Sequence, residues 1–72
     1  MNNLNVAKIQ LNGSSYEINN ETNLNQLLNK LKIQKNKVAI EVNGAIVEKN
    51  KYLKVILNKG DKVEIVHFIG GG

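Results

Sequence analysis

The residues of this chain best suited to chemistry are its last three, Gly70–Gly72, which directly follow the apolar pair Phe68 and Ile69. Glycine has no side chain, so a run of glycines can pass through a channel too narrow for other residues. The run ends on an α-carboxylate, which becomes an electrophile once a good leaving group is attached. A terminal glycine run can equally be a frayed end. Its attachment to an apolar strand end, without a spacer, favours a functional tail.

The composition excludes most other chemistry. The 72 residues include no cysteine, proline or tryptophan, so a disulfide framework, a thiolate zinc site and a thiol nucleophile are excluded. A chain this short buries only about 60% of its unfolded surface and has little room for a substrate cleft. We expect the single histidine, His67, to be a strand-edge residue rather than a catalyst, and Asp61 to be a turn residue. The sequence predicts no enzyme, no metal site and no cofactor bound by the chain.

The charge pattern is typical of a solvated surface. The net charge of +4 comes from ten lysines, spread from Lys8 to Lys62, against six acidic residues. Nucleic-acid-binding surfaces favour arginine and cluster basic with aromatic residues, whereas this chain has no arginine and three aromatics. No apolar run could cross a bilayer, and the first residues lack the pattern of a signal peptide. We expect a cytoplasmic protein, monomeric when free, that binds neither nucleic acid nor membranes.

The elements that must position the tail begin with a β-hairpin. Asn12-Gly13 lies between two alternating segments, and Asn-Gly is the preferred pair for a two-residue hairpin turn. The turn pairs Leu11 with Ser14. In this register the apolar residues share one face; they are Ala7, Ile9, Leu11, Tyr16 and Ile18.

A helix follows the first hairpin. Leu24, Leu27, Leu28 and Leu31 recur at the i, i+3, i+4, i+7 spacing of one helical face. Thr22 precedes this stripe and is expected to cap the helix with its hydroxyl. A leucine stripe of this kind predicts the face that packs on a sheet.

Strand character returns after the helix. Val38–Val47 predicts a second hairpin, turning at Asn43-Gly44 and pairing Val42 with Ala45. The segment 48–57 is expected to be irregular or to form a short helical turn; its expected anchors are Tyr52, Leu53, Val55 and Ile56. After a turn at 59–61, the final strand is Lys62–Phe68, with Val63 and Ile65 pointing inward.

This order of elements predicts a two-layer α+β domain with one main helix on one face of a mixed sheet of four to five strands. The last strand is expected to lie beside the first and parallel to it. The opposite face of the sheet is then left for solvent or a partner. We expect one domain, 1–69, with residues 1–5 as a lead-in, followed by a flexible glycine tail, 70–72.

A β-grasp (ubiquitin-like) order of elements that ends on Gly-Gly resembles the prokaryotic sulfur carriers. The likeness is greater to the thiamine-pathway sulfur carriers than to the small subunit of molybdopterin synthase, which commonly has prolines before its glycines. The resemblance runs from about Val6 to the end of the chain. Its segments are Ile9–Gly13, Leu27-Leu28, Val38–Gly44, Gly60–Val66 and Phe68–Gly72. The chain departs from the family where Pro, a basic residue and a tryptophan are common; here Glu48–Asn50 and Tyr52 stand instead.

The resemblance implies a carrier rather than an enzyme. An E1-like adenylyltransferase would use its own ATP and Mg to adenylate the carboxylate of Gly72. A sulfur donor protein would then displace AMP, and the resulting thiocarboxylate would give its sulfur to a thiazole synthase. Gly70 and Gly71 would thread the enzyme's channel, and Val66, Phe68 and Ile69 would form the docking surface. Phe68 could alternatively close the end of the core.

Other functions remain open on the sequence alone. The chain could carry sulfur for molybdopterin, or be a ubiquitin-like modifier joined through Gly72 to a target lysine. It could be an adaptor domain with an idle tail, which a deletion of Gly71-Gly72 would reveal through retained function. RNA binding is a further alternative, and its signature would be a steep loss of affinity with added salt.

Overall fold

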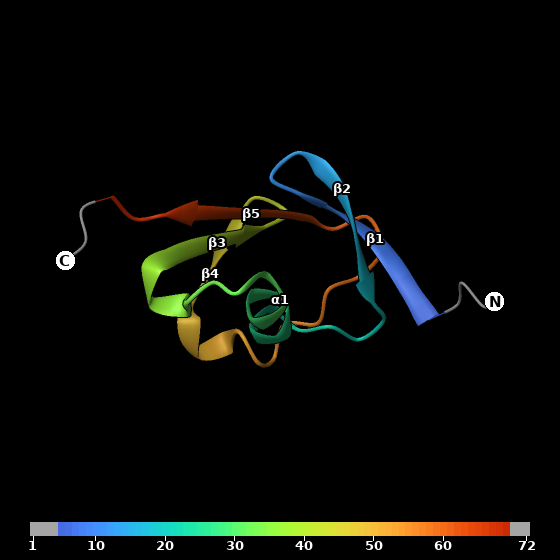
Figure 1. The fold of residues 1–72 in the computed structure, drawn as a ribbon, viewed down its shortest axis with the longest axis horizontal. Helices are drawn as coiled ribbons and strands as arrows, with labels where there is room; N and C mark the ends of the chain where they lie inside the picture. Colours follow the sequence, from blue (N-terminus) through green and yellow to red (C-terminus); the bar gives the residue numbers. More distant parts are fainter. Residues whose placement is uncertain (1–4, 70–72) are drawn as a thin grey trace.

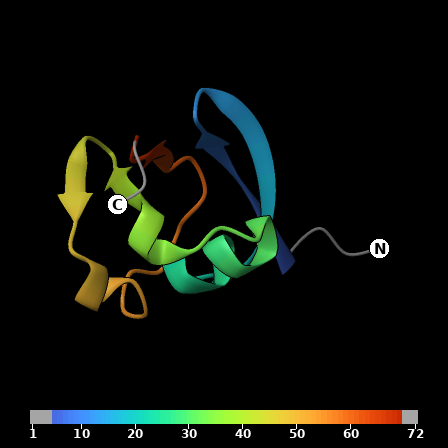
Figure 2. The same cartoon turned by 60° about the vertical axis from the view of Figure 1, so that its left-hand side comes forward.

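The computed structural model describes residues 5–69, which form one helix on a five-stranded sheet (Figures 1 and 2). The elements are β1 (Val6–Leu11), β2 (Ser14–Asn19), α1 (Leu24–Leu31), β3 (Val38–Val42), β4 (Ala45–Val47) and β5 (Lys62–His67), with short 3₁₀ turns η2 (Lys35–Lys37) and η3 (Lys49–Lys51). The strand order is β2-β1-β5-β3-β4. β5 pairs with β1 in parallel, whereas the other neighbours are antiparallel. The predicted α+β architecture and the parallel closure of the sheet are therefore confirmed.

Both hairpins form at their Asn-Gly turns in the predicted registers. Leu11 pairs with Ser14, and Val42 pairs with Ala45. The φ angles are 49° and 83° at Asn12 and Gly13, and the turn at Asn43-Gly44 has 52° and 87°. Two consecutive positive φ angles are the requirement of the tight hairpin turn that matches the twist of the strands. Local turn chemistry thus fixes the register of four of the five strands.

The helix has the predicted buried stripe, but the prediction of its cap was wrong. Asn23, not Thr22, caps α1: its side chain accepts a hydrogen bond from the backbone N–H of Gln26 at 2.8 Å. The Gln26 side chain in turn accepts from the N–H of Asn23 at 2.9 Å, which completes a capping box. The Thr22 hydroxyl donates instead to the carbonyl of Asn19 at 2.6 Å. The spacing from Asn23 to Gln26, three residues apart, is the signal that distinguishes the two candidates.

The core lies between α1 and the sheet. Its buried residues are Ala7, Ile9, Ile18, Leu24, Leu27, Leu28, Val38, Ile40, Tyr52, Leu57, Val63 and Ile65. All three leucines that begin the helical stripe are at most 1% exposed, and Leu31 is half-buried. The inward direction of Val63 and Ile65, predicted from the alternation of the last strand, is confirmed.

The segment between β4 and β5 corrects part of the predicted anchors. Tyr52 is buried and Val55 is half-buried, but Leu53 is 66% exposed and Ile56 is 45% exposed. The reason lies in the backbone. The N–H of Leu57 bonds to the carbonyl of Thr22, and the carbonyl of Val55 accepts from Leu24. This pairing extends the chain at 55–57, so alternate side chains face the core and Ile56 points away.

The hydroxyl of Tyr52 gives a testable prediction. Tyr52 is 1% exposed, and its hydroxyl oxygen has no hydrogen-bond partner among residues 5–69. A buried polar group without a partner costs about 1–3 kcal/mol. We therefore expect Tyr52→Phe to raise the free energy of unfolding by about 1 kcal/mol, which corresponds to a rise in Tm of about 4–8 °C for a domain of this size. Thermal unfolding followed by circular dichroism measures it.

The same substitution should change the response to alkali. Burial raises the pKa of Tyr52. As the pH rises past the ordinary tyrosine value of about 10, the unfolded chain releases this proton before the folded chain does, so the folded state loses stability. Tyr52→Phe should remove the part of the alkaline loss of stability that comes from Tyr52. Tyr16→Phe, which makes the same change at a half-buried tyrosine, is the control. A Tyr52→Phe protein less stable than wild type near neutral pH would show that the hydroxyl has a partner.

Candidate functional site

The last strand, β5, ends at one end of the described part of the molecule. β5 lies between β1 and β3, and its C-terminal end is far from the start of β1 along the long axis (Figure 1). The strand ends at His67, one residue before the predicted boundary. The residues predicted to carry the chemistry, Gly70, Gly71 and Gly72, lie outside the described residues. What the structure describes is the strand and the surface from which they continue.

The asparagines of both hairpin turns hold β5. The Asn12 side chain accepts from the N–H of Ile65 at 2.7 Å and donates to the carbonyl of Ile65 at 3.2 Å, as a neighbouring strand would do. Asn43 accepts from the N–H of Lys62 at 2.9 Å through its side chain. It also donates to the Asp61 carboxylate at 3.1 Å, and Asp61 accepts from the N–H of Asn58. Asp61 is thus the predicted turn residue, and the two amides fix the strand that leads to the tail.

The three predicted docking residues lie together at the end of β5 and are exposed. Val66 is 56% exposed, Phe68 57% and Ile69 100%. Because side chains alternate along a strand, Val66 points away from α1 while Val63 and Ile65 point toward it. The N–H of Phe68 donates to the carbonyl of Lys37 at 2.9 Å. This bond holds the backbone of Phe68 beside the residue that precedes β3, while the Phe68 side chain is exposed. The alternative, in which Phe68 closes the core, was wrong.

The open face of the sheet adds a residue that the sequence reading missed. Glu41 pairs with Glu64 on one side and with Ile46 on the other, and Ala39 pairs with Val66. Ile46 therefore shares the face of Val66, and it is 71% exposed. The predicted pairing of Val42 with Ala45 already implied this position, since the next pair joins Glu41 to Ile46. Val66 and Ile46 are thus exposed apolar side chains on the sheet face opposite α1, and they share that face with Glu41 and Glu64.

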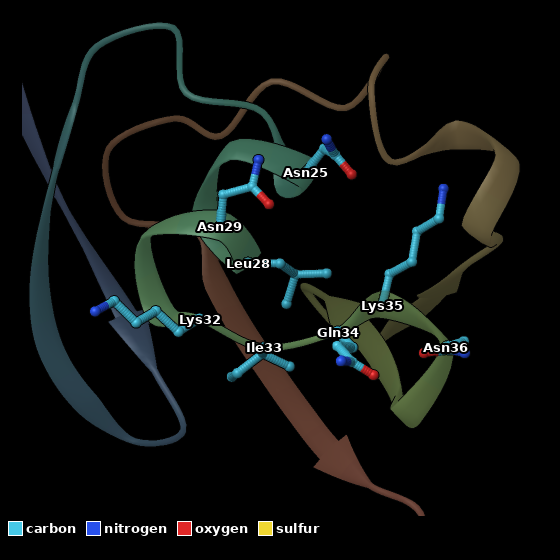
Figure 3. Close-up of a pocket in the computed structure, with 8 residues that line it drawn as sticks. All are labelled: Asn25, Leu28, Asn29, Lys32, Ile33, Gln34, Lys35 and Asn36. Carbon is cyan, nitrogen blue, oxygen red and sulfur yellow. The ribbon is translucent and has the colours of Figure 1, made fainter.

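The other described features are an exposed histidine and a surface hollow. Within residues 5–69, His67 is exposed, and no group of three His, Cys, Asp or Glu side chains could hold a metal ion. The described part of the chain has no helix long and apolar enough for a membrane span. A hollow of about 560 Å³ lies beside α1 and is lined by amides, lysines and aliphatic side chains, among them Asn25, Asn29 and Lys35 (Figure 3). Its lining includes no Asp, Glu, His, Ser, Thr, Cys or Tyr side chain.

A comparison with known proteins shows which family this chain is similar to. The model of the ThiS family matches residues 9–72. The sulfur carrier protein ThiS of Bacillus subtilis is 37% identical over 65 residues, which are 89% of this chain and 98% of that protein. A thiazole synthase of Magnetococcus marinus is 45% identical over 65 residues, 90% of this chain, but the chain spans only 20% of its length.

The fold has a solved counterpart as well. The crystal structure of the thiamine biosynthesis protein ThiS from Geobacter metallireducens superposes with a TM-score of 0.79 at 31% identity, over 90% of this chain and 99% of that one. The five-stranded mixed sheet with one helix is thus the β-grasp fold of that protein. Because the family model matches nearly the whole sequence, including all three terminal glycines, this chain belongs to the ThiS family.

Proposed function

We propose that this chain is a sulfur carrier that delivers sulfur for thiazole formation in thiamine biosynthesis as a thiocarboxylate on Gly72. The observation that carries the proposal is the family match over residues 9–72, which covers the glycine run as well as the fold. The exposure of the residues before that run also supports the proposal. Val66, Phe68 and Ile69 are all exposed, so an enzyme could contact the end of β5. The chain would be a substrate of its partners and not an enzyme itself.

The chemistry follows from the poor reactivity of a carboxylate. An E1-like adenylyltransferase, with its own Mg and ATP, would let the Gly72 carboxylate attack the α-phosphate and release pyrophosphate. The acyl carbon then carries AMP, a good leaving group. Hydrosulfide supplied by a donor protein would attack that carbon and expel AMP, and loss of its proton would leave a thiocarboxylate with no change in oxidation state. This chain would supply only the carboxylate, the glycine tail and the docking surface.

The thiazole synthase relatives favour thiazole formation over molybdopterin synthesis. A segment 45% identical to this chain makes up 20% of a protein named thiazole synthase. Joining a carrier to the enzyme that consumes its sulfur raises their effective concentration to the millimolar range for a short linker. The encounter also requires a surface of the carrier that the enzyme can contact. The exposed apolar residues on the open face, Ile46 and Val66, with Phe68 are the contacts we propose for it.

The test is a reconstitution. The full chain is incubated with the candidate adenylyltransferase of the same cells, Mg-ATP and a sulfur donor, and its intact mass is measured. The expected product is heavier by the difference between one sulfur and one oxygen atom, and it should be absent without ATP. A tail joined to a lysine of another protein would instead identify a modifier. An unchanged mass under conditions that convert a known family member would refute the proposal.

A further inference from the structure

Lys49 lies beside Phe68, at the point where the chain leaves the sheet. We call Phe68 and Ile69, which precede the terminal glycines, the root of the tail. Its ammonium donates a hydrogen bond to the carbonyl of Val38 at 2.9 Å. The same nitrogen lies 5.3 Å from the centroid of the Phe68 ring, within the range of a cation–π contact. One side chain therefore links the turn η3, the beginning of β3 and the residue that follows β5.

The register of the sheet explains why the Val38 carbonyl needs this donor. β3 pairs Val42 with Ala45 and Ile40 with Val47, and β4 ends there. Two more residues in β4 would place Lys49 opposite Val38, the first residue of β3, where its backbone N–H would serve that carbonyl. The chain instead turns into η3 at Lys49. The side-chain ammonium thus replaces the missing backbone donor, and this fixes the position of the charge.

The fixed ammonium acts on the tail root through Phe68. The backbone of Phe68 is attached to Lys37 by its N–H, while its ring is exposed. An exposed ring without a neighbour would sample several rotamers, and a partner would have to select one of them. With the cation over one face, the ring has a preferred orientation, and its other face and its edge stay available.

We infer that Lys49 is a positioning residue of the carrier, which orients Phe68 and so sets how the root of the tail meets the activating enzyme. This inference rests on the proposed function, because it assigns Lys49 a role in presenting that same tail. Within residues 5–69, the Lys49 ammonium contacts the Val38 carbonyl and the Phe68 ring, so its proposed role is in positioning and not in the reaction itself. Its effect should appear in the recognition of the carrier and not in the rate of the chemical step.

The test uses three variants of the full chain. Lys49→Met removes the charge and the donor but keeps most of the aliphatic stem, and Lys49→Arg keeps a cation that can stack on an aromatic ring. Lys51→Met is the matched control, because Lys51 lies in the same 3₁₀ turn and loses the same charge. We expect Lys49→Met to raise the KM of the carrier in adenylation about fivefold with kcat unchanged, as loss of a weakly preorganised contact would do. Lys49→Arg should stay within about twofold of wild type.

A second readout is independent of the enzyme. Protons held over an aromatic ring are shifted upfield, so the ε-methylene protons of Lys49 should show this shift in NMR spectra and lose it in Phe68→Leu. An unshifted signal would show that the contact does not persist in solution and would overturn the inference. So would a Lys49→Met protein with the KM of Lys51→Met, or one whose apparent KM rises only in proportion to the loss of folded protein measured by circular dichroism. A wild-type chain that is never adenylated would instead refute the proposed function.

Discussion

Removal of Gly71 and Gly72 is expected to abolish adenylation, with a fall in kcat/KM of at least about a hundredfold, while the fold keeps its stability. The truncated chain still ends on a carboxylate, but that group is about 7 Å short of its original reach, since an extended residue spans about 3.5 Å. Misplacement of a reacting group by even about 1 Å can cost a hundredfold in rate. The buried core lies within residues 7–65, so we expect Tm to change little.

The control for this experiment removes the same number of residues elsewhere. Deletion of Asn2 and Asn3 also shortens the chain by two residues, and both precede β1, which begins at Val6. It should leave adenylation near the wild-type rate. Pyrophosphate exchange measures the adenylation step, and circular dichroism reports the fold. Near-normal adenylation of the chain without Gly71 and Gly72 would show that Gly72 is not the activated residue.

A substitution at Gly72 tests whether the tail enters a narrow channel of the adenylyltransferase, as the run of glycines suggests. Gly72→Ala adds one methyl group next to the reacting carboxylate and leaves the length of the tail unchanged. This variant should lose more in transfer than in stability, and the loss should be smaller than that of the truncation. Equal losses in transfer and in stability would contradict the separation between tail and fold.

The parts of the fold that were predictable from the sequence are those specified by neighbouring residues. The Asn-Gly pairs at 12–13 and 43–44 require positive φ angles that few other pairs accept, so turn and register follow together. The leucine stripe of α1 has a period that no strand shares. The alternation of β5 likewise indicated that Val66 would be exposed while Val63 and Ile65 are buried.

The remaining features depend on contacts between distant residues. Leu53 and Ile56 are as apolar as Val55, and only the pairing of 55–57 with the residues before α1 decides which of them is buried. The Asn12 amide meets Ile65 across 53 positions of sequence. Nor does the sequence show that the Lys49 ammonium replaces a strand donor, since this requires β4 to end at Val47. Local patterns do not contain these pairings.

The tail and the core should therefore respond to mutation in different ways. In the proposed function, activation depends on Gly72 and on the exposed end of β5, whereas the stability of the fold depends on side chains between α1 and the sheet. The strand β5 connects the two, because Val63 and Ile65 are buried and Val66 is exposed along the same six residues. A core mutation should lower activity only through the fraction of folded molecules, which temperature can restore.

Leu27→Ala provides that comparison and should have the largest effect on stability. Leu27 is 0% exposed in the centre of the helical stripe. Loss of a fully buried leucine side chain costs about 3 kcal/mol, from a total of about 4–10 kcal/mol for a domain of this length. We expect Tm to fall by about 12–24 °C. Leu53→Ala makes the same chemical change at a side chain that is 66% exposed, and should move Tm by only a few degrees at most.

The activity of the Leu27→Ala protein separates stability from chemistry. Below its Tm, where the protein is mostly folded, adenylation should proceed at nearly the wild-type rate, because Leu27 is buried in α1, whereas the exposed Val66 points to the sheet face opposite that of the buried Ile65. Near its Tm the rate should fall in proportion to the folded fraction measured by circular dichroism. The chain without Gly71 and Gly72 should show the opposite behaviour, folded but inactive at every temperature. If cooling failed to restore adenylation to Leu27→Ala, the core would have to act on the tail directly, and the fold could not be only a support for the glycine run.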